Sequence, residues 1–207
     1  MLVVALAAGG AVQAQPAGGL LGQPLAAAQS NDLFTFFNLA QTARQPCGDG
    51  QALGFRPTGD QFHRLAAVDV TTTAGGDVAA MTLTLDRTFI DDPANGVFAR
   101  DIAKSFLRDV AGSRAPASVA DLAQEIESGV SSSRTVIERG GVAPAKPAGP
   151  PSTGYRVFLG DQRSYTLSVD GEALTLANAR QSGRAVLRLS FSIGGAVPAC
   201  AMGAVPD

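Results

Sequence analysis

The side chains best suited to covalent or metal chemistry are the thiols of Cys47 and Cys200, the two cysteines of the chain. A pair of thiols can form a disulfide, bind a metal ion or supply a nucleophile. The sequence has one histidine and no C-x-x-C motif, so the neighbouring ligands of a metal site are missing. For an exported protein we predict a Cys47–Cys200 disulfide, and a reactive thiol or a metal ligand is the alternative.

The other residues with catalytic potential lack the partners that catalysis needs. His63 is the single histidine, and no G-x-S-x-G or S-x-x-K motif accompanies the serines. The glycines of 48–54 have the spacing of a phosphate loop, but a helix is predicted before them, where a strand is needed. Asp91 and Asp92 are not followed by the distal Glu of a calcium loop. We therefore predict no catalytic residue, no cofactor and no metal site.

One surface has the character of a docking site. Arg100, Lys104 and Arg108 repeat every four residues on a predicted helix, opposite its apolar stripe. We predict that they form a docking surface for an envelope protein or an anionic polymer, and a solvated helix face is the alternative. Arg87 interrupts the apolar row of a predicted strand. It is either a residue at the end of the sheet or a cavity charge with a carboxylate partner.

The first residues point to export. Residues 1–14 are an uncharged apolar run that ends in Val-Gln-Ala, so we predict a signal peptide cleaved after Ala14. No Lys or Arg precedes the run, and a frayed apolar N-terminus is the alternative. No other stretch approaches the roughly 20 apolar residues of a membrane-spanning helix. We predict a periplasmic or secreted protein whose mature chain has no transmembrane segment.

Composition indicates one globular domain. The 207 residues are 45% hydrophobic and 16% charged, with a net charge of −2, which excludes extensive disorder and gives no basic footprint for nucleic acid. Residues 15–29 are expected to be a flexible leader, and 30–200 the domain. A Gly- and Pro-rich loop is expected at 140–154, and a tail at 201–207.

Helix signals dominate the first two thirds of the chain. The pattern predicts helices over 31–44, 59–67, 93–112 and 118–130, with caps at Asn31, Thr58, Asp92 and Ser118. Residues 77–90 alternate between apolar and polar side chains, which predicts a strand, placed along one edge of the sheet. The segment 130–139 fits either a helix or a strand.

Strand signals dominate the last third. Asp170-Gly171 separates two alternating segments, 165–169 and 172–176, which predicts a hairpin in which Leu167 faces Leu174. Strands at 154–160 and 184–195 would complete a four-stranded meander. The expected fold is α+β, with helices packed on a mainly antiparallel sheet in two layers. The disulfide would tie the first helix to the C-terminal end of the domain.

These observations favour an exported, non-enzymatic binding or interaction module of the cell envelope. The alternative is a small-ligand carrier or a hydrolase that uses a cavity between the sheet and the helices. The sequence names no ligand, substrate or partner.

Overall fold

The computed structural model describes residues 19–92, 94–112, 117–138, 151–169, 171–194 and 200. Its centre is a seven-stranded sheet with the spatial order β1-β2-β3-β4-β7-β6-β5, in which every neighbouring pair is antiparallel. The strands are β1 (Leu39–Cys47), β2 (Gly50–Pro57), β3 (Ala66–Thr72), β4 (Val78–Asp86), β5 (Ser164–Val169), β6 (Glu172–Gln181) and β7 (Arg184–Ile193). The α+β class and the antiparallel sheet are confirmed.

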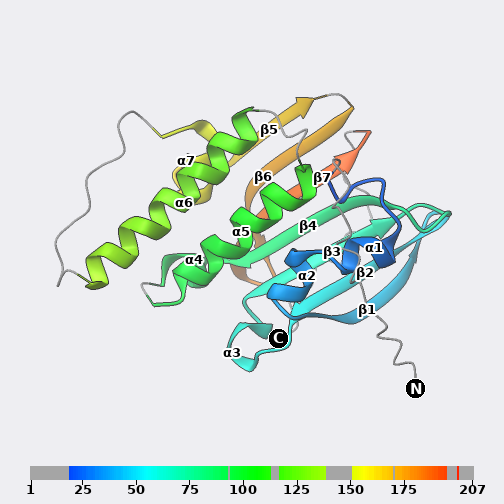
Figure 1. The fold of residues 1–207 in the computed structure, drawn as a ribbon, viewed down its shortest axis with the longest axis horizontal. Helices are drawn as coiled ribbons and strands as arrows, with labels where there is room; N and C mark the ends of the chain where they lie inside the picture. Colours follow the sequence, from blue (N-terminus) through cyan, green and yellow to red (C-terminus); the bar gives the residue numbers. More distant parts are fainter. Residues whose placement is uncertain are drawn as a thin grey trace, which may run out of the picture.

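The helices of the described chain gather on one side of the sheet (Figure 1). They are α1 (Leu25–Gln29), α2 (Asp32–Phe36), α3 (Asp60–His63), α4 (Arg87–Asp91), α5 (Gly96–Ala111), α6 (Ala117–Glu138) and α7 (Thr153–Leu159). The longest two, α5 and α6, pack side by side in front of the strands, and the short α3 lies beyond the ends of β2 and β3 (Figure 1). This arrangement is the predicted two-layer architecture.

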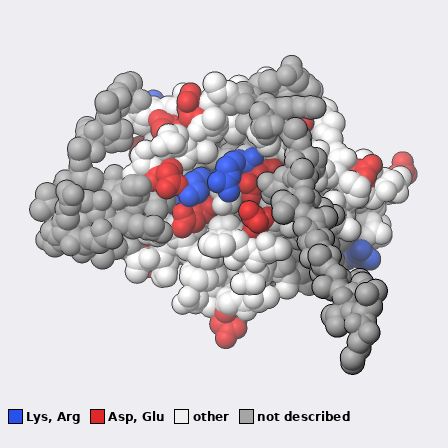
Figure 2. Space-filling view, in the orientation of Figure 1, with Lys and Arg blue, Asp and Glu red and all other residues white. Residues whose placement is uncertain are grey.

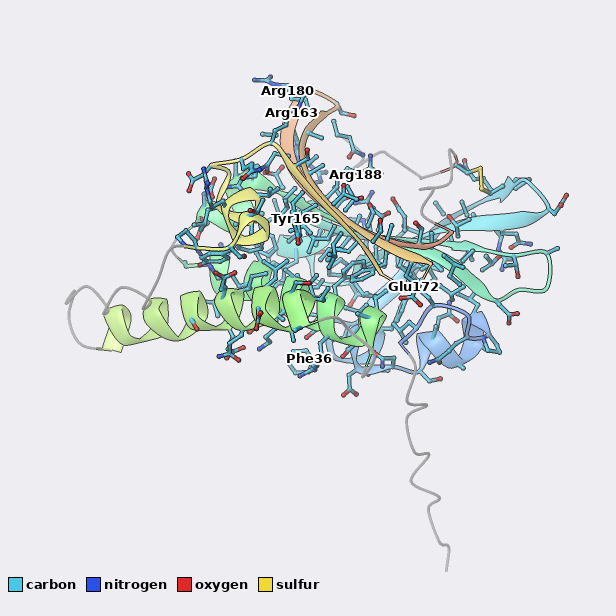
Figure 3. The ribbon with its side chains drawn as sticks, turned by 90° about the horizontal axis from the view of Figure 1, so that it is seen from above. Phe36, Arg163, Tyr165, Glu172, Arg180 and Arg188 are labelled. Atoms are coloured by element: carbon cyan, nitrogen blue, oxygen red, sulfur yellow. A yellow bond between two sulfur atoms is a disulfide. The ribbon has the colours of Figure 1, made fainter. Side chains whose placement is uncertain are left out.

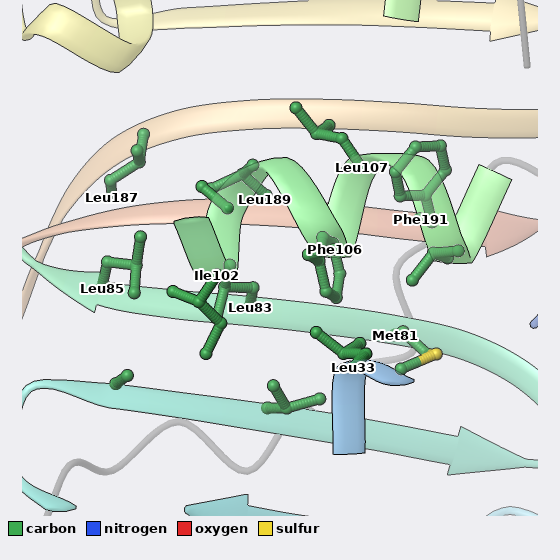
Figure 4. Close-up of a cluster of buried hydrophobic side chains, with 14 of the residues drawn as sticks. Leu33, Met81, Leu83, Leu85, Ile102, Phe106, Leu107, Leu187, Leu189 and Phe191 are labelled. Carbon is green, nitrogen blue, oxygen red and sulfur yellow. The ribbon is translucent and has the colours of Figure 1, made fainter. Parts of the chain in front are cut away.

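The core lies between α5 and the central strands. Ile102, Phe106 and Leu107 of α5 are fully buried, as the helical periodicity of the sequence predicts. They meet the inward rows of β4 and β7, which are Met81, Leu83 and Leu85, and Leu187, Leu189 and Phe191 (Figure 4). Burying each such side chain contributes about 1.5–3 kcal/mol, so this contact makes a large contribution to stability.

The hairpin at the C-terminal edge has the predicted register. Val169 pairs with Glu172, Leu167 with Leu174 and Tyr165 with Leu176. The turn requires a residue that tolerates a positive φ, and Gly171 supplies it with a φ of 82°. The strand expected at 184–195 is β7, which ends at Ile193.

The helix predicted at 31–44 is wrong beyond its first turns. Asn31 caps α2 as expected, because its side chain accepts a hydrogen bond from the Leu33 N–H at 2.8 Å. The helix ends at Phe36, Asn38 adopts a φ of +48°, and the following residues form β1. Pairing with β2 supplies the backbone hydrogen bonds of this segment, so tertiary context overrides its helical pattern.

Three further expectations are corrected. The helix expected at 59–67 is limited to α3, because Ala66 already begins β3, which is buried on both faces. The strand expected at 77–90 lies at the centre of the sheet, not at an edge, and ends at Asp86. The strand expected at 154–160 is α7, capped by Ser152 at one end and Gly160 at the other. In the described sheet β5 therefore lies at an edge, without the neighbour expected from 154–160, and β7 pairs with β4 on its other side.

The segment 130–139, for which either a helix or a strand was expected, is helical as far as residue 138. The segment from 130 continues α6 to Glu138, and that helix begins at Ala117, so the predicted cap Ser118 lies within it. Residues 19–29, expected in a flexible leader, are packed: Leu20 is buried, and α1 follows. The predicted signal peptide, the tail and most of the 140–154 loop lie outside the described residues.

Arg87 joins two helices at the end of the sheet. Phe158 and Leu159 are the last residues of α7. The Arg87 guanidinium donates hydrogen bonds to their carbonyl oxygens, at 2.6 Å and 2.9 Å respectively. It also pairs with Asp91 at 3.0 Å, within its own helix α4. Arg87 is therefore a residue at the end of the sheet with a carboxylate partner.

We expect Arg87→Met to lower the free energy of unfolding by about 2 kcal/mol, because two carbonyls of α7 lose a charged donor. Urea denaturation at pH 7 measures the change. Arg108→Met is the matched control, because the Arg108 side chain is 65% exposed and its ion pair with Asp109 should contribute less than about 1 kcal/mol. Equal losses for the two variants would show that the contacts of Arg87 do not stabilise the fold.

Candidate functional site

The predicted basic stripe on α5 is largely paired with acidic groups. Lys104 contacts Glu127 of α6 and lies 3.4 Å from Asp101. Arg108 lies 3.2 Å from the carboxylate of its neighbour Asp109. Figure 2 shows blue side chains at the centre of the helical face with red ones on both sides. The stripe is therefore a mixed-charge surface and not a continuous cationic one.

Arg100 is separated from the other two members of the stripe. It is half-buried, and its Nε is buried without a hydrogen-bond partner in the described structure. Its charge acts on Tyr155 of α7: burial raises the pKa of that phenol, and Arg100 opposes the shift. Of the three predicted docking residues, only Lys104 and Arg108 line the same surface groove.

This groove lies between α2, α5 and α6, with a volume of about 600 Å³. It is lined by Asp32, Thr35, Phe36, Phe37, Asp101, Lys104, Ser105, Arg108 and Glu127. We call it the α2–α5–α6 groove. It contains both apolar and charged side chains, and two of the three predicted docking residues line it.

Phe36 gives the groove an exposed aromatic side chain. It is 74% exposed, whereas its neighbours Phe34 and Phe37 are each 4% exposed. Its ring meets that of Phe37 edge to face, with the centroids 5.0 Å apart. In Figure 3 Phe36 lies on the helical side of the molecule, away from the sheet. On the helix predicted over 31–44, Phe36 would widen the buried face beside Phe34 and Phe37; in the structure it is exposed instead.

Asp109, the acidic partner of the groove residue Arg108, is affected by burial. Asp109 is mostly buried, and this raises the pKa of its carboxyl, while the hydrogen bond from Arg108 lowers it. Its second oxygen has no hydrogen-bond partner in the described structure. Arg108 is thus paired with a carboxylate that is itself largely buried.

A second polar cluster lies on the other side of the sheet, where Figure 3 shows Arg188. Asp69 of β3 is buried on this side, and desolvation raises the pKa of its carboxyl to about 7. The charges of Arg188 on β7 and Arg56 on β2 oppose the shift. Small residues surround Asp69 in register: Gly54 on one side and Thr82 on the other. No spacing or motif in the sequence marks this cluster.

The two cysteines form the predicted disulfide. Their sulfur atoms lie 2.22 Å apart and their Cα atoms 5.6 Å apart. The Gln45 side chain also donates to the Cys200 carbonyl at 3.3 Å. Cys47 is the last residue of β1, so the bond fastens Cys200 to an edge strand and not to the first helix as expected. Three strands, β2, β3 and β4, separate β1 from β7 in the sheet.

The other chemical candidates have structural roles. The Nδ1 of His63 lies 3.1 Å from the Pro57 carbonyl, and the ring is half-buried. Gly48 adopts a φ of 57° in the turn between β1 and β2. Asp92 accepts hydrogen bonds from two backbone N–H groups before α5. In the described part of the chain, no group of three or more His, Cys, Asp or Glu side chains could hold a metal ion.

Comparison with known proteins found no matching family model, curated protein or solved structure. None of the described helices is long and apolar enough to cross a membrane.

Proposed function

We propose that this chain is an exported protein of the cell envelope and a non-enzymatic binding module whose partner docks in the α2–α5–α6 groove. The observation that carries the proposal is Phe36, a large aromatic side chain that is 74% exposed beside a groove of about 600 Å³. Aromatic residues with neighbouring arginines are the residues that most often dominate protein interfaces.

The packing between the two layers favours a binding module over the carrier or hydrolase. Large side chains from α5, β4 and β7 fill the space between the sheet and the helices (Figure 4). Ile102, Phe106 and Leu189 are fully buried there. A ligand in this layer would have to displace them, at a cost of several kcal/mol for each side chain.

The charges of the groove favour a protein partner over an anionic polymer. Three of its side chains are acidic and two are basic. Lys104 already forms ion pairs with Asp101 and Glu127, so a polyanion would have to compete with both carboxylates for its ammonium group. A protein can instead pack an apolar side chain against Phe36 and offer charges of both signs to the surrounding groups.

Export is supported by the signal-like first residues and by the disulfide. Disulfides persist in oxidising compartments and are rare in reducing ones. The Cys47–Cys200 bond therefore fits a periplasmic or secreted protein. Export is tested separately from the docking site by treating intact cells with a membrane-impermeant labelling reagent. The reagent should label the protein if it is exported.

Photo-crosslinking tests the docking site. A benzophenone side chain at position 36 should capture one discrete protein from cell-envelope extract, which mass spectrometry then identifies. The same side chain at position 193 is the matched control, because Ile193 is also an exposed apolar residue, at 51%, and lies at the end of β7. Equal adducts at both positions would argue against the groove.

Affinity for the identified protein provides the quantitative test. We expect Phe36→Ala to weaken the binding roughly 30-fold, which is the loss of about 2 kcal/mol typical of an interface hot spot. The free energy of unfolding of the Phe36→Ala variant should differ from that of the native protein by less than about 1 kcal/mol, because the Phe36 side chain is exposed. Ile193→Ala should alter neither quantity. Unchanged affinity for Phe36→Ala would overturn the assignment of the groove.

A further inference from the structure

The sheet has two edges, and they differ in how well they are protected. Within the described chain, β1 pairs only with β2, and β5 pairs only with β6. The β1 edge carries Pro46, the charged Arg44 and an irregularity between Gln41 and Ala43. Prolines, charges and bulges are the devices that keep edge strands from pairing with other chains. The β5 edge, Ser-Tyr-Thr-Leu-Ser-Val, has none of them.

The backbone of β5 presents a regular row of groups to the outside. The Asn178 N–H donates to the Arg163 carbonyl at 2.8 Å, and β5 and β6 continue in antiparallel register from there. In an antiparallel ladder the direction of the backbone groups alternates along the strand. Residues 165 and 167 therefore bond to β6, whereas the N–H and C=O groups of Ser164, Thr166 and Ser168 point outwards. These three residues are all exposed.

The outward groups match those of a second β5 strand in an antiparallel, two-fold arrangement. With Thr166 opposite the second copy's Thr166, Ser164 faces Ser168 on both sides of the axis. All three pairs then join residues whose backbone groups point outwards. The side chains match as well: hydroxyls meet hydroxyls on one face, and Tyr165 meets Leu167 on the face that packs against the core.

The charges at the two ends of the β5–β6 hairpin are opposite. Figure 3 shows Arg163 and Arg180 at one end and Glu172 at the other. All three side chains are exposed. A two-fold antiparallel pairing brings the basic end of one copy beside the acidic end of the other. The second copy's Arg163 would face Val169, which pairs with Glu172, so the two charges would lie about 10 Å apart between backbones.

We infer that β5 is a dimerisation edge, at which two copies of this chain join their sheets by antiparallel β5–β5 pairing centred on Thr166. The surface lies on a different element from the α2–α5–α6 groove, so the inference does not depend on the proposed function. The partner is a second copy because the edge is self-complementary in backbone direction, side-chain type and charge.

Charge variants at the two-fold axis test this inference. The purified, disulfide-bonded protein should sediment in analytical ultracentrifugation as a dimer, at twice the mass that mass spectrometry gives for its single chain. Thr166→Lys places two like charges directly opposite each other, and we expect it to weaken dimerisation at least tenfold. Thr166→Glu should do the same. An equimolar mixture of the two variants should restore the dimer, because each Lys then faces a Glu.

A backbone variant and a control at the other edge complete the test. Thr166→Pro removes an outward N–H while leaving the β5–β6 hydrogen bonds in place, and should also give a monomer. Gln41→Lys on β1 should leave the dimer intact. A monomeric native protein at 200 µM, or a dimer that none of the Thr166 variants weakens, would overturn the inference. Dissociation by Gln41→Lys alone would place the interface at β1 instead.

Discussion

Replacing both Cys47 and Cys200 with Ser should lower the free energy of unfolding by roughly 4 to 5 kcal/mol. The bond closes a loop with a sequence separation of 153 residues, and in the chain-entropy model such a closure strongly reduces the freedom of the unfolded chain. Urea denaturation of the native and double-variant proteins measures the loss. Reduction of the native protein with dithiothreitol should produce the same loss, because it opens the same loop without altering the sequence.

The single variants are the matched controls for this prediction. Cys200→Ser and Cys47→Ser should each match the double variant within about 1 kcal/mol, because either one opens the loop. Cys47 is buried and Cys200 is partly exposed, so any extra cost should appear with Cys47→Ser. A loss below 1 kcal/mol in the double variant would show that the unfolded chain is constrained by something other than this bond.

Asp69→Asn should stabilise the protein at pH 8 by up to about 4 kcal/mol and leave it almost unchanged at pH 4. Burial raises the pKa of Asp69 to about 7, whereas a carboxyl in the unfolded chain titrates near pH 3.9. The folded state therefore binds the proton more tightly. The stability of the native protein is highest below pH 4 for this group and falls as the pH rises to about 7.

The pH dependence of unfolding is the measurement that checks this prediction. Urea midpoints of the native protein should fall between pH 4.5 and pH 8, and Asp69→Asn should remove most of that slope. A smaller part remains, because burial also raises the pKa of Asp109. Asp121→Asn, on an exposed part of α6, is the control and should keep the native slope. The same slope in Asp69→Asn would show that Asp69 is ionised in the folded protein at neutral pH.

Local signals predicted those parts of the fold that local chemistry decides. The Asp-Gly turn sets the register of β5 and β6, and the four-residue spacing of Ile102, Phe106 and Val110 sets the buried face of α5. The disulfide was predicted because the chain has two cysteines and was expected to be exported. These features depend on residues close in sequence, or on a pairing with no alternative partner.

The missed elements depend on neighbours that are distant in sequence. β1 is a strand because β2 lies beside it, although residues 39–44 continue a helical pattern. Residues 154–160 alternate like a strand, but the caps at Ser152 and Gly160 and the packing of Phe158 make them a helix. Propensity alone does not separate such cases.

The candidate site was predicted only in part for the same reason. Lys104 and Arg108 were found from helical spacing, but Glu127, which pairs with Lys104, belongs to another helix. Phe36 is exposed because α2 ends after a few residues, and no local signal marks that end. Asp69 lies within an apolar run, and only the positions of Arg56 and Arg188 across the sheet show it to be part of a charged cluster.

The pairing of β4 with β7 has a consequence for how the chain reaches its folded state. Ala80 pairs with Ser192 and Asp86 with Val186, partners about a hundred residues further along the chain. During synthesis, β4 therefore cannot pair with β7 until nearly the whole polypeptide has left the ribosome. Non-local pairings of this kind slow folding and leave aggregation-prone intermediates. A chain that stops before residue 184 would expose one flank of β4, and we expect it to aggregate.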